Sequence, residues 1–515
     1  MTKSKKLSDF NYFSSIQLVI TAALDKELPI PWIRSKGFPV FHITALDSGI
    51  LKTLTPETPG VLFVITGTGL SASKKAAIWI KNNLNPLFVV NLGTCGLLEG
   101  DFQQGDWVIP RFSIDDTNNP VKLDTRIPFS LPKELTIFQA GALLSVDQPV
   151  FDPEKYTFSK HFENKLDPSD ELELLKKPGF YVDMESYAQA EIFDKHAISF
   201  HSIKMITDYA NHSTRTDYFA AVNRCRTGIQ VILEWLEPKP MVDISVIIPV
   251  FNRQDHIKEC VDSVLNQTLS PKEVIVVNDA SQDKTSKILN AYGNKIKVID
   301  LDKNKGVSFA RNIGVKESQG NWICFLDSDD KWTPDKLENQ AEFFKKYPFY
   351  EVLQSQEVWI RNGKRVNSCQ HHDKPQGWVF EQCLDLCLIS PSSVMIKKDL
   401  FWDFGGFDES FPACEDYDLW IRLSRQKPVG LDPSLSTIKY GGHADQLSKQ
   451  FPAMDRFRVQ SLLKALSQEE NLNYKQKIND LLNEKLHILI QGAKKRNLVT
   501  DVNSYQDILS RLGTE

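Results

Sequence analysis

The stretch Cys324-Phe-Leu-Asp-Ser-Asp-Asp-Lys-Trp332 places three carboxylates within four positions, directly after a run of mostly apolar residues. An apolar run that ends in charge predicts a buried strand, and α/β proteins bind ligands at the carboxyl ends of such strands. Neighbouring carboxylates repel one another unless a cation lies between them, and their oxygens suit Mg²⁺ or Mn²⁺. We therefore interpret Asp327 and Asp329 as a site for a metal ion and a diphosphate. The alternative interpretation is a solvated acidic loop that closes a strand.

Strand-like and helical segments alternate ahead of this acidic tip. Apolar, β-branched runs cover residues 243–252, 273–278 and 297–301, and residues 254–269 place apolar side chains at helical spacing. An alternation that leads to an acidic strand end predicts a parallel nucleotide-binding sheet. The acidic tip is then expected at the edge of the sheet where the nucleotide binds.

The order of motifs over residues 243 to about 448 closely resembles family 2 glycosyltransferases of the GT-A fold. Five motifs carry the resemblance: S-V-I-I-P-V-F-N-R, V-N-D-A-S-Q-D, N-K-G-V-S-F-A-R-N, F-L-D-S-D-D and A-C-E-D-Y-D-L-W. By resemblance, three residues hold the base and ribose of a nucleotide-sugar donor: Pro249, Phe251 and Asp279. The resemblance also implies that Asp327 and Asp329 meet the ribose and the metal on the diphosphate, and that Arg311 lies near the donor.

An acceptor hydroxyl needs a base, and Glu415-Asp416 holds the nearest candidates. The family motif favours Asp416, and one carboxylate opposite the leaving group predicts a single displacement with inversion at the anomeric carbon. His443 is a further candidate metal ligand, and a loop histidine bonded to backbone is an equally favoured interpretation. Residues 389–396 lie where this family builds its acceptor cavity, and they leave a glycan, a lipid or a nucleoside open as acceptor. No Q-x-x-R-W segment follows the E-D motif, which argues against a processive polymerase.

The first half of the chain repeats the alternation of strands and helices. A parallel or mixed sheet with helices on its faces is predicted by strand-like runs at residues 17–22, 61–66 and 87–92 and a helical segment at 71–80. Glycine turns are expected at residues 66–69 and 93–96. Glycine in such turns lets backbone N–H groups approach a ligand closely.

Three carboxylates lie at or just beyond the ends of predicted strands in this half: Glu27, Glu185 and Asp208. Cleavage of an N-glycosidic bond needs an acid for the leaving base, a group that orients water and a clamp on the ribose hydroxyls. These three positions supply one residue for each role. The alternative interpretation makes them surface residues or helix caps.

Residues 16–236 resemble the purine nucleoside phosphorylase and methylthioadenosine/S-adenosylhomocysteine nucleosidase superfamily through the ordered segments A-L-D-K-E-L, G-T-G, N-L-G-T-C-G, V-D-M-E and T-D-Y-A-N. The resemblance implies that Glu27 helps to position the attacking water and that Met184 packs by the ribose. It implies that Glu185 binds the 2′ and 3′ hydroxyls and that Asp208 protonates the purine at N7. Phosphorylases of the superfamily carry an arginine shortly after the first strand, where this chain has lysine and glutamate. Hydrolysis of a purine nucleoside is therefore favoured over phosphorolysis.

Length, composition and charge limit the number of domains and the classes of partner. The chain has 515 residues, 41% of them apolar and 25% charged, with a formal net charge of -5. These values predict two or three globular domains and give no whole-chain affinity for nucleic acid or an anionic membrane. No run approaches 18 uncharged apolar residues, so no membrane span is expected. The cysteines are scattered along the chain, which fits reduced thiols in the cytoplasm. A zinc site is disfavoured because neither cysteine pair among its candidate ligands has two-residue spacing. These candidates are Cys369, His371, His372, Cys383 and Cys387.

Two prolines in Glu237-Pro-Lys-Pro240 predict a domain boundary. We therefore expect two α/β domains: a nucleoside phosphorylase/nucleosidase-like three-layer sandwich over residues 1–238 and a GT-A nucleotide-sugar transferase over residues 239–450. A helical extension is expected over residues 451–515. Two alternatives stay open: the first domain is a non-catalytic nucleoside-binding module, or the protein glycosylates a nucleoside or tRNA base. A homodimer through the first domain is also left open.

Overall fold

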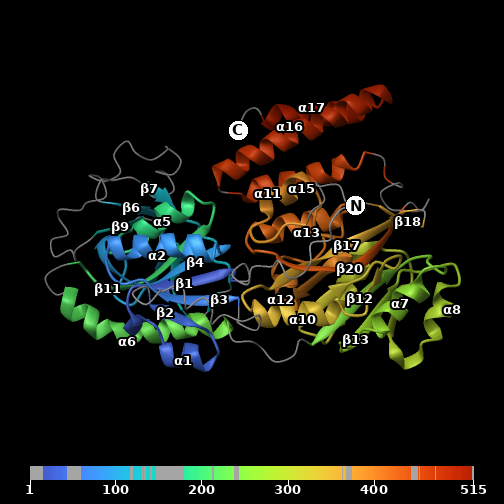
Figure 1. Cartoon of the computed structure of the whole chain (residues 1–515). Helices are drawn as coiled ribbons and strands as arrows, with labels where there is room; N and C mark the ends of the chain where they lie inside the picture. The colour runs from blue at the N-terminus through green and yellow to red at the C-terminus, as the bar shows by residue number, and fades with distance from the viewer. Residues whose placement is uncertain are drawn as a thin grey trace, which may run out of the picture. The chain divides into compact units, whose positions relative to one another are not determined.

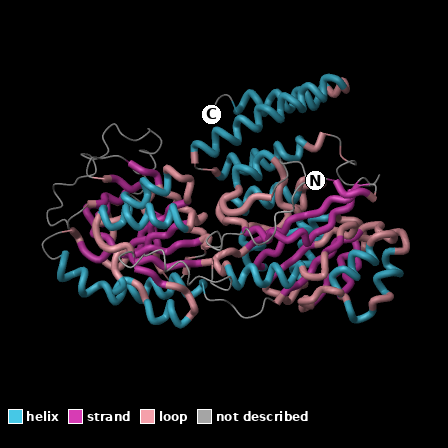
Figure 2. The backbone as a smooth tube through the Cα atoms, viewed as in Figure 1, coloured by secondary structure: helices cyan, strands magenta, loops and turns pink. Residues whose placement is uncertain are grey.

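The computed structural model describes residues 16–42, 60–115, 120–129, 131–132, 135–139, 142–146, 179–210, 214–236, 243–361, 363–366, 374–441, 451, 453–469 and 471–512. The chain forms two compact units. Unit 1 comprises Met1–Pro238 with Lys345–Phe349, and unit 2 comprises Lys239–Phe344 with Tyr350–Glu515. Each unit is a mixed α/β structure with one sheet (Figures 1 and 2).

Unit 1 is built on an eleven-stranded sheet in the order β2-β3-β1-β4-β10-β9-β6-β7, with β11 pairing β4 and β5, and β8 pairing β5. The strands are β1 Leu18–Ala22, β2 Val40–His42, β3 Val61–Ile65, β4 Phe88–Glu99, β5 Trp107–Ile109, β6 Phe112–Ile114, β7 Pro120–Lys122, β8 Ile137–Gln139, β9 Ala142–Ser145, β10 Phe180–Asp183 and β11 Ser199–Asp208. The helices are η3 Asp25–Glu27, α1 Ile30–Ser35, α2 Leu70–Asn83, α5 Ser186–Asp194, α6 Thr214–Leu233 and η7 Glu234–Leu236.

Helices cover both faces of this sheet. Figure 1 shows α2 and α5 on one face and α1 and α6 on the other. Strands β1 and β3 are buried along their whole length and pair in parallel, which explains why their sequences are continuous apolar runs rather than alternating ones. The predicted three-layer α/β sandwich is confirmed.

The two predicted glycine turns have different outcomes. The segment after β3 is a turn, in which Gly67 and Gly69 adopt φ values of 81° and 90°. The turn predicted at residues 93–96 is wrong, because β4 continues through it to Glu99. Strands β10 and β11 pair with this second half of β4 and take up its backbone hydrogen bonds.

Unit 2 has a nine-stranded sheet in the order β14-β13-β12-β15-β19-β17-β20-β16, with β18 pairing β17. The strands are β12 Ile244–Val250, β13 Glu273–Asn278, β14 Lys297–Asp300, β15 Trp322–Phe325, β16 Lys331–Trp332, β17 Val352–Arg361, β18 Lys364–Val366, β19 Val394–Lys397 and β20 Gly430–Gly441. The helices are α7 Ile257–Leu265, α8 Thr285–Asn290, η8 Gly293–Lys295, α9 Val307–Lys316, α10 Lys336–Lys346, α11 Phe380–Asp385, η10 Pro391–Ser393, α12 Lys398–Asp403, α13 Glu415–Ser424, α15 Asp455–Gln468, α16 Leu472–Lys495 and α17 Val499–Leu512.

The predicted parallel sheet is present in unit 2. Strands β12, β13, β14 and β15 pair in parallel, and β19 then joins β15 in antiparallel orientation. The acidic tip follows β15 directly, at the carboxyl edge of these strands. The tail forms three helices, and the inner faces of α15 and α16 join α11 and α13 in one apolar cluster.

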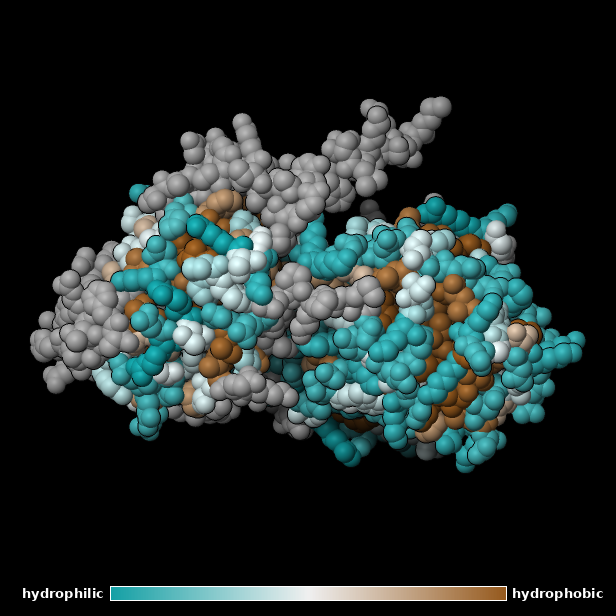
Figure 3. Space-filling view, turned by 90° about the horizontal axis from the view of Figure 1, so that it is seen from below, coloured by the Kyte–Doolittle hydropathy of each residue, from teal (hydrophilic) through white to brown (hydrophobic). Residues whose placement is uncertain are grey.

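Among the described residues, no helix combines the length and the apolar character that a bilayer crossing requires. On the face drawn in Figure 3, apolar residues lie in bands between hydrophilic ones.

Candidate active sites

The acidic tip of unit 2 is tied to the E-D motif by one arginine. Arg311, on α9, donates from Nη2 to Oδ1 of Asp327 and from Nη1 to Oε1 of Glu415, each at 2.7 Å. The guanidinium is 4% exposed and lies 4.9 Å above the centre of the Phe407 ring. Two motifs 88 positions apart in the sequence, at Asp327 and Glu415, therefore meet through a buried cation.

The pKa values of the three carboxylates at the tip are shifted in different directions. Burial tends to raise the pKa of Asp327, but Arg311 holds it below its ordinary value. Burial, followed by the charge of Asp327, raises the pKa of Asp329. Burial also raises the pKa of Asp330, to about 8. Ionisation at this tip is therefore easiest at Asp327, and the charge of Asp327 makes ionisation of its neighbours more costly.

Asp330 has a structural position that the sequence did not indicate. Its Oδ2 accepts from Ser392 Oγ at 2.7 Å and its Oδ1 accepts from the backbone N–H of Tyr440 at 3.1 Å. The same Ser392 hydroxyl accepts from the backbone N–H of Asp327 at 3.1 Å. The segment predicted to build an acceptor cavity therefore braces the acidic tip through a fully buried serine.

Lys439, on β20, is a second cation that sequence reasoning missed. Its ammonium lies 3.8 Å from Oδ2 of Asp330 and donates to Ser390 Oγ at 2.9 Å. Burial opposes its charge, but four acids together raise its pKa: Asp330, Glu357, Asp327 and Asp416. Asp416 and the acidic tip therefore lie within electrostatic range of one ammonium group.

Asp416 stands in the first turn of α13. The helix begins after Cys414, which adopts φ 63° in the left-handed region, an unfavourable conformation for a residue with a Cβ. Within the first turn of α13, Glu415 is buried against Arg311, whereas Asp416 is half-buried and accepts from the backbone N–H of Tyr417 at 2.8 Å.

The residues predicted to hold the nucleotide lie at the ends of β12 and β13. Pro249 is buried within β12, opposite Val277, whereas Phe251 follows the strand and is 42% exposed. Asp279 is buried, and its two oxygens accept from the backbone N–H groups of Lys305 at 2.7 Å and Gly306 at 2.9 Å. Asp279 therefore fixes the loop that leads into α9.

The donor set at the tip fits a hard divalent cation. Asp329 is half-buried, and its raised pKa reflects an unfavourable charge beside Asp327 that a cation would offset. The described residues contain no group of three or more His, Cys, Asp or Glu arranged to hold a metal. A diphosphate would have to supply further oxygen ligands. His443 lies outside the described residues, as do Cys369, His371 and His372.

In unit 1, Glu27 lies in η3 and is 3% exposed. Its Oε2 accepts from the backbone N–H of Leu24 at 3.0 Å, and its Oε1 accepts from Thr94 Oγ1 at 2.9 Å. A Cβ at Gly93 would lie 3.5 Å from Glu27 Oε1, which is an ordinary van der Waals contact, so the carboxylate lies directly against β4. Burial, partly offset by Lys204, raises the pKa of Glu27.

Lys204, on β11, is the buried cation of this site. Its Nζ lies 3.0 Å from Oδ2 of Asp183, and the two side chains are 2% and 0% exposed. Burial opposes the ammonium charge, but Asp183, Glu185 and Glu27 raise its pKa. Burial, with the charges of Asp183 and Glu27, raises the pKa of Glu185 to about 8. Lys204 thus lies within electrostatic range of two of the three predicted acids, Glu27 and Glu185.

Asp208 is the last residue of β11, which pairs with the edge of β4 opposite to β10. It pairs across the strand with Gly96, which on its opposite side pairs with Val182 of β10. A Cβ at Gly96 would lie 2.8 Å from Asp208 Oδ1, so glycine is required there. The Asp208 carboxylate accepts from Ala210 N at 2.8 Å and from Thr207 Oγ1 at 2.9 Å. The neighbouring strands therefore bring Asp208 and the end of β10 to one edge of the sheet.

Met184 lies between Asp183 and Glu185 and is half-buried, whereas the predicted acids Glu27, Glu185 and Asp208 are all buried. Its backbone N–H donates to Glu185 Oε2 at 3.3 Å. Cys95 is buried between these groups, and burial raises the pKa of its thiol.

Comparison with known proteins gives a separate match for each half. The profile of glycosyl transferase family 2 matches residues 245–405, and that of the phosphorylase superfamily matches residues 19–228. An uncharacterized glycosyltransferase of Rickettsia prowazekii is 31% identical over 257 residues, which cover 47% of this chain and 78% of the relative. The UDP-Glc:alpha-D-GlcNAc-diphosphoundecaprenol beta-1,3-glucosyltransferase WfgD of Escherichia coli is 32% identical over 207 residues, or 38% of this chain and 74% of the relative.

The match is partial for other proteins. The chain spans about a third of the length of related glycosyltransferases from Rickettsia bellii, Rickettsia felis and Rickettsia conorii, namely 34%, 35% and 35%. The structure of S. aureus TarS 1-349 in complex with UDP is 24% identical, with a TM-score of 0.38, and the match covers 48% of this chain and 72% of that one. The first half is similar to the phosphorylase superfamily, and the chain belongs to glycosyl transferase family 2 through its second half.

Proposed function

We propose that unit 2 transfers a sugar from a nucleotide-sugar donor to an acceptor hydroxyl, with inversion at the anomeric carbon. The observation that supports this most strongly is the Arg311 bridge, which holds the D-S-D tip and the E-D motif at one sheet edge. A leaving-group site and a candidate base are both needed for a single displacement, and the bridge keeps their motifs together.

Each residue has a distinct role in this proposal. Phe251 offers an exposed ring to the nucleotide base, Pro249 shapes the strand end beside it, and Asp279 holds the loop before α9. Arg311 is buried against two acids, so it acts as a positioning residue rather than as a direct donor ligand. Asp416 accepts the proton of the acceptor hydroxyl as the new bond forms.

Asp327 and Asp329 would hold Mg²⁺ or Mn²⁺ in this proposal, with His443 as a further predicted ligand. When bound, the ion supplies positive charge to the departing diphosphate. Asp327 remains anionic beside Arg311, and this charge would attract the cation.

One assay tests the transferase proposal. The full-length protein is incubated with Mn²⁺ and a panel of nucleotide sugars, and nucleotide release is followed by mass spectrometry. Release that a chelator and Asp329→Ala both abolish supports the proposal. Release that neither treatment alters would remove the metal mechanism.

The acceptor is a separate proposal. The name of the Escherichia coli relative includes a diphosphoundecaprenol-linked sugar, so a lipid-linked sugar is the first acceptor class to test. A soluble glycan and a nucleoside are the other two acceptor classes to test. Cytoplasmic location and dimerisation through unit 1 also stay predictions.

For unit 1, the buried cluster of Glu27, Glu185 and Lys204 supports hydrolysis of a purine N-glycosidic bond. Glu27 would orient the water, Glu185 would bind the ribose hydroxyls beside Met184, and Asp208 would protonate the base at N7. Release of free base from an adenine nucleoside, and its loss in Asp208→Asn, is the expected result. No release across a nucleoside panel, with the nucleoside still bound, would favour the non-catalytic module instead.

A further inference from the structure

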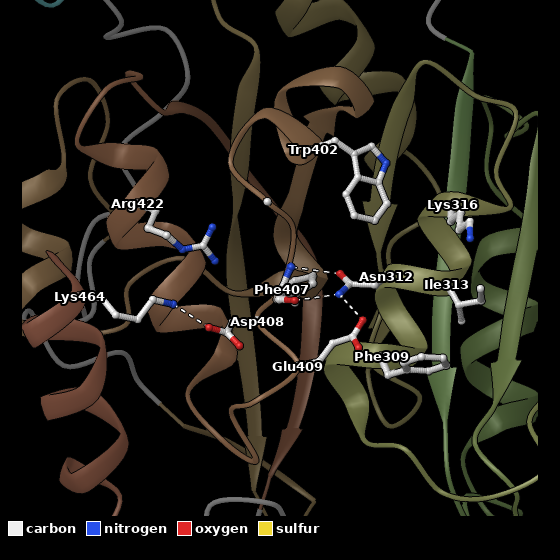
Figure 4. A pocket seen from close by; sticks show the side chains of 11 residues that line it. Phe309, Asn312, Ile313, Lys316, Trp402, Phe407, Asp408, Glu409, Arg422 and Lys464 are labelled. Atoms are coloured by element: carbon white, nitrogen blue, oxygen red, sulfur yellow. Dashed lines mark hydrogen bonds and ion pairs between the residues drawn. The ribbon is translucent and has the colours of Figure 1, made fainter. Parts of the chain in front are cut away.

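A cavity of about 640 Å³ opens in unit 2 on the outward side of α9. Its walls come from α9, from α12 and the segment that follows it, and from helices α13 and α15. Figure 4 shows the Trp402 ring above the cavity, with the carboxylates of Asp408 and Glu409 below it in the view. A volume of this size accommodates a small ligand. None of the residues assigned above to the donor, the metal or the base lines it.

The loop beneath this cavity is firmly held. Gly405 and Gly406 adopt φ values of 78° and 66°, and a Cβ at Gly406 would lie 3.0 Å from Asn312 Oδ1. Asn312 donates to the carbonyl of Phe407 at 2.8 Å and accepts from its N–H at 3.1 Å. Arg422 donates to the carbonyls of Phe404 and Gly406. A loop pinned from both sides presents its side chains in fixed positions, as a preformed site requires.

The walls of the cavity combine an exposed aromatic ring with hydrogen-bonding groups. Trp402 is 39% exposed, which is high for a residue that normally buries most of its surface. Glu409 accepts from Asn312 Nδ2 at 3.0 Å through Oε1, and a carboxylate has capacity for several further donors. Phe309 and Ile313 add an apolar wall from α9. This mixture suits a ligand with an apolar face and several hydroxyl donors.

The charges around the cavity balance only when the buried Asp418, which lies behind the wall, is counted with the lining residues. Lys464 pairs with Asp408 and with Asp418, each at 2.8 Å, and Arg422 pairs with Asp418 at 2.7 Å. The carboxylate of Glu409 and the ammonium of Lys316 complete the set. With balanced charge, the cavity has no strong preference for an anion or a cation, and a neutral ligand fits it best.

We propose that this cavity binds a neutral sugar ring of a glycan, with the ring's apolar face on Trp402 and its hydroxyls donating to Asp408 and Glu409. The choice of carbohydrate over other hydroxylated ligands rests on the proposed transferase function. The Phe407 ring lines the cavity and also packs under the Arg311 guanidinium. An occupied subsite would therefore lie one side chain away from the residue that positions the acidic tip.

Saturation-transfer NMR on the full-length protein, without nucleotide or metal, tests the subsite. The probes are disaccharides of glucose, galactose, mannose and N-acetylglucosamine. At least one should receive saturation from the protein, and Trp402→Ala should weaken its binding at least tenfold, whereas Trp402→Phe retains most of it. Leu435→Ala is the matched control, because Leu435 is another exposed apolar residue of unit 2, at 48% exposure.

Three outcomes would overturn the subsite. No probe binds, or Trp402→Ala binds as well as the wild type with an unchanged circular dichroism spectrum, or UDP with Mn²⁺ displaces the sugar. Failure of the proposed transferase is a different result, because it appears as absence of nucleotide release while sugar binding and its dependence on Trp402 persist.

Discussion

Arg311 donates a 2.7 Å hydrogen bond from Nη2 to Oδ1 of Asp327, and its other terminal nitrogen pairs with Glu415. The guanidinium is buried, so this contact is not a surface ion pair that salt would screen. Its fork geometry lets one side chain hold two carboxylates in fixed directions. We regard this contact as the link between the leaving-group end and the base end of the proposed transferase site.

Replacing Arg311 with lysine should impair the transferase without unfolding unit 2. Lysine keeps the charge but cannot hold both acids in a planar fork, so Asp327 and Asp416 would shift relative to each other. A displacement of about 1 Å costs roughly 100-fold in rate, and we expect kcat to fall by about that factor. Arg361→Lys, at an exposed arginine of β17, should leave nucleotide release unchanged. Equal activity of both variants would show that the bridge is not needed.

Replacing Lys204 with methionine should destabilise unit 1. The lysine is buried against Asp183, and removal of one partner leaves an uncompensated buried charge. Such losses are about 3–5 kcal/mol. Hydrogen exchange of the β10 and β11 amides should report faster opening in Lys204→Met than in Lys204→Arg, which keeps the charge. Protection equal to that of the wild type in Lys204→Met would contradict the assignment of Lys204 as the counter-charge.

The stability of unit 1 should depend on pH through Glu185. Its pKa is raised from an ordinary value of 4.5 to about 8. The unfolded chain therefore loses this proton near pH 4.5, whereas the native state retains it until about pH 8. The native state binds more protons in that window, so the free energy of unfolding falls as pH rises through it.

Glu185→Gln removes this titration and should flatten the pH dependence. Hydrogen exchange of β10 at pH 5 and pH 8, corrected for the intrinsic exchange rate, should show a larger loss of protection in the wild type than in Glu185→Gln. Glu234→Gln, at an exposed glutamate of the same unit, is the control. An identical pH dependence in Glu185→Gln and the wild type would mean that Glu185 is ionised at neutral pH.

Sequence patterns predicted most strands and helices of both units because the apolar residues follow clear patterns along them. Strands β12, β13 and β15 are buried on both faces, and continuous apolar runs of this kind are readily recognised. The glycine-rich segment at residues 93–96 was misread because glycine after a strand usually marks a turn. Here glycine serves another purpose, since Gly96 leaves space beside Asp208 within a continuing strand.

Two lysines, Lys204 and Lys439, escaped prediction because their positions depend on strand register, whereas Arg311 was predicted from its motif. Lys204 lies within an apolar run on β11, and only its pairing with Gly93 places it beside Glu27 and Asp183. Lys439 is likewise placed by β20, far in sequence from Asp330. A lysine in a strand carries no signal of its own, whereas acids that follow apolar runs do. The sequence did contain one signal for these lysines: each predicted site had a net negative charge and therefore required a counter-charge.

The central claim is that Asp416 and the acidic tip work in one transferase site. The most direct test is steady-state kinetics of Asp416→Asn with the donor identified in the nucleotide-sugar panel and an acceptor for which the wild type is active. Loss of a general base should lower kcat by about 10²–10⁴-fold while donor affinity stays near that of the wild type. Transfer at the wild-type rate by Asp416→Asn would contradict the account.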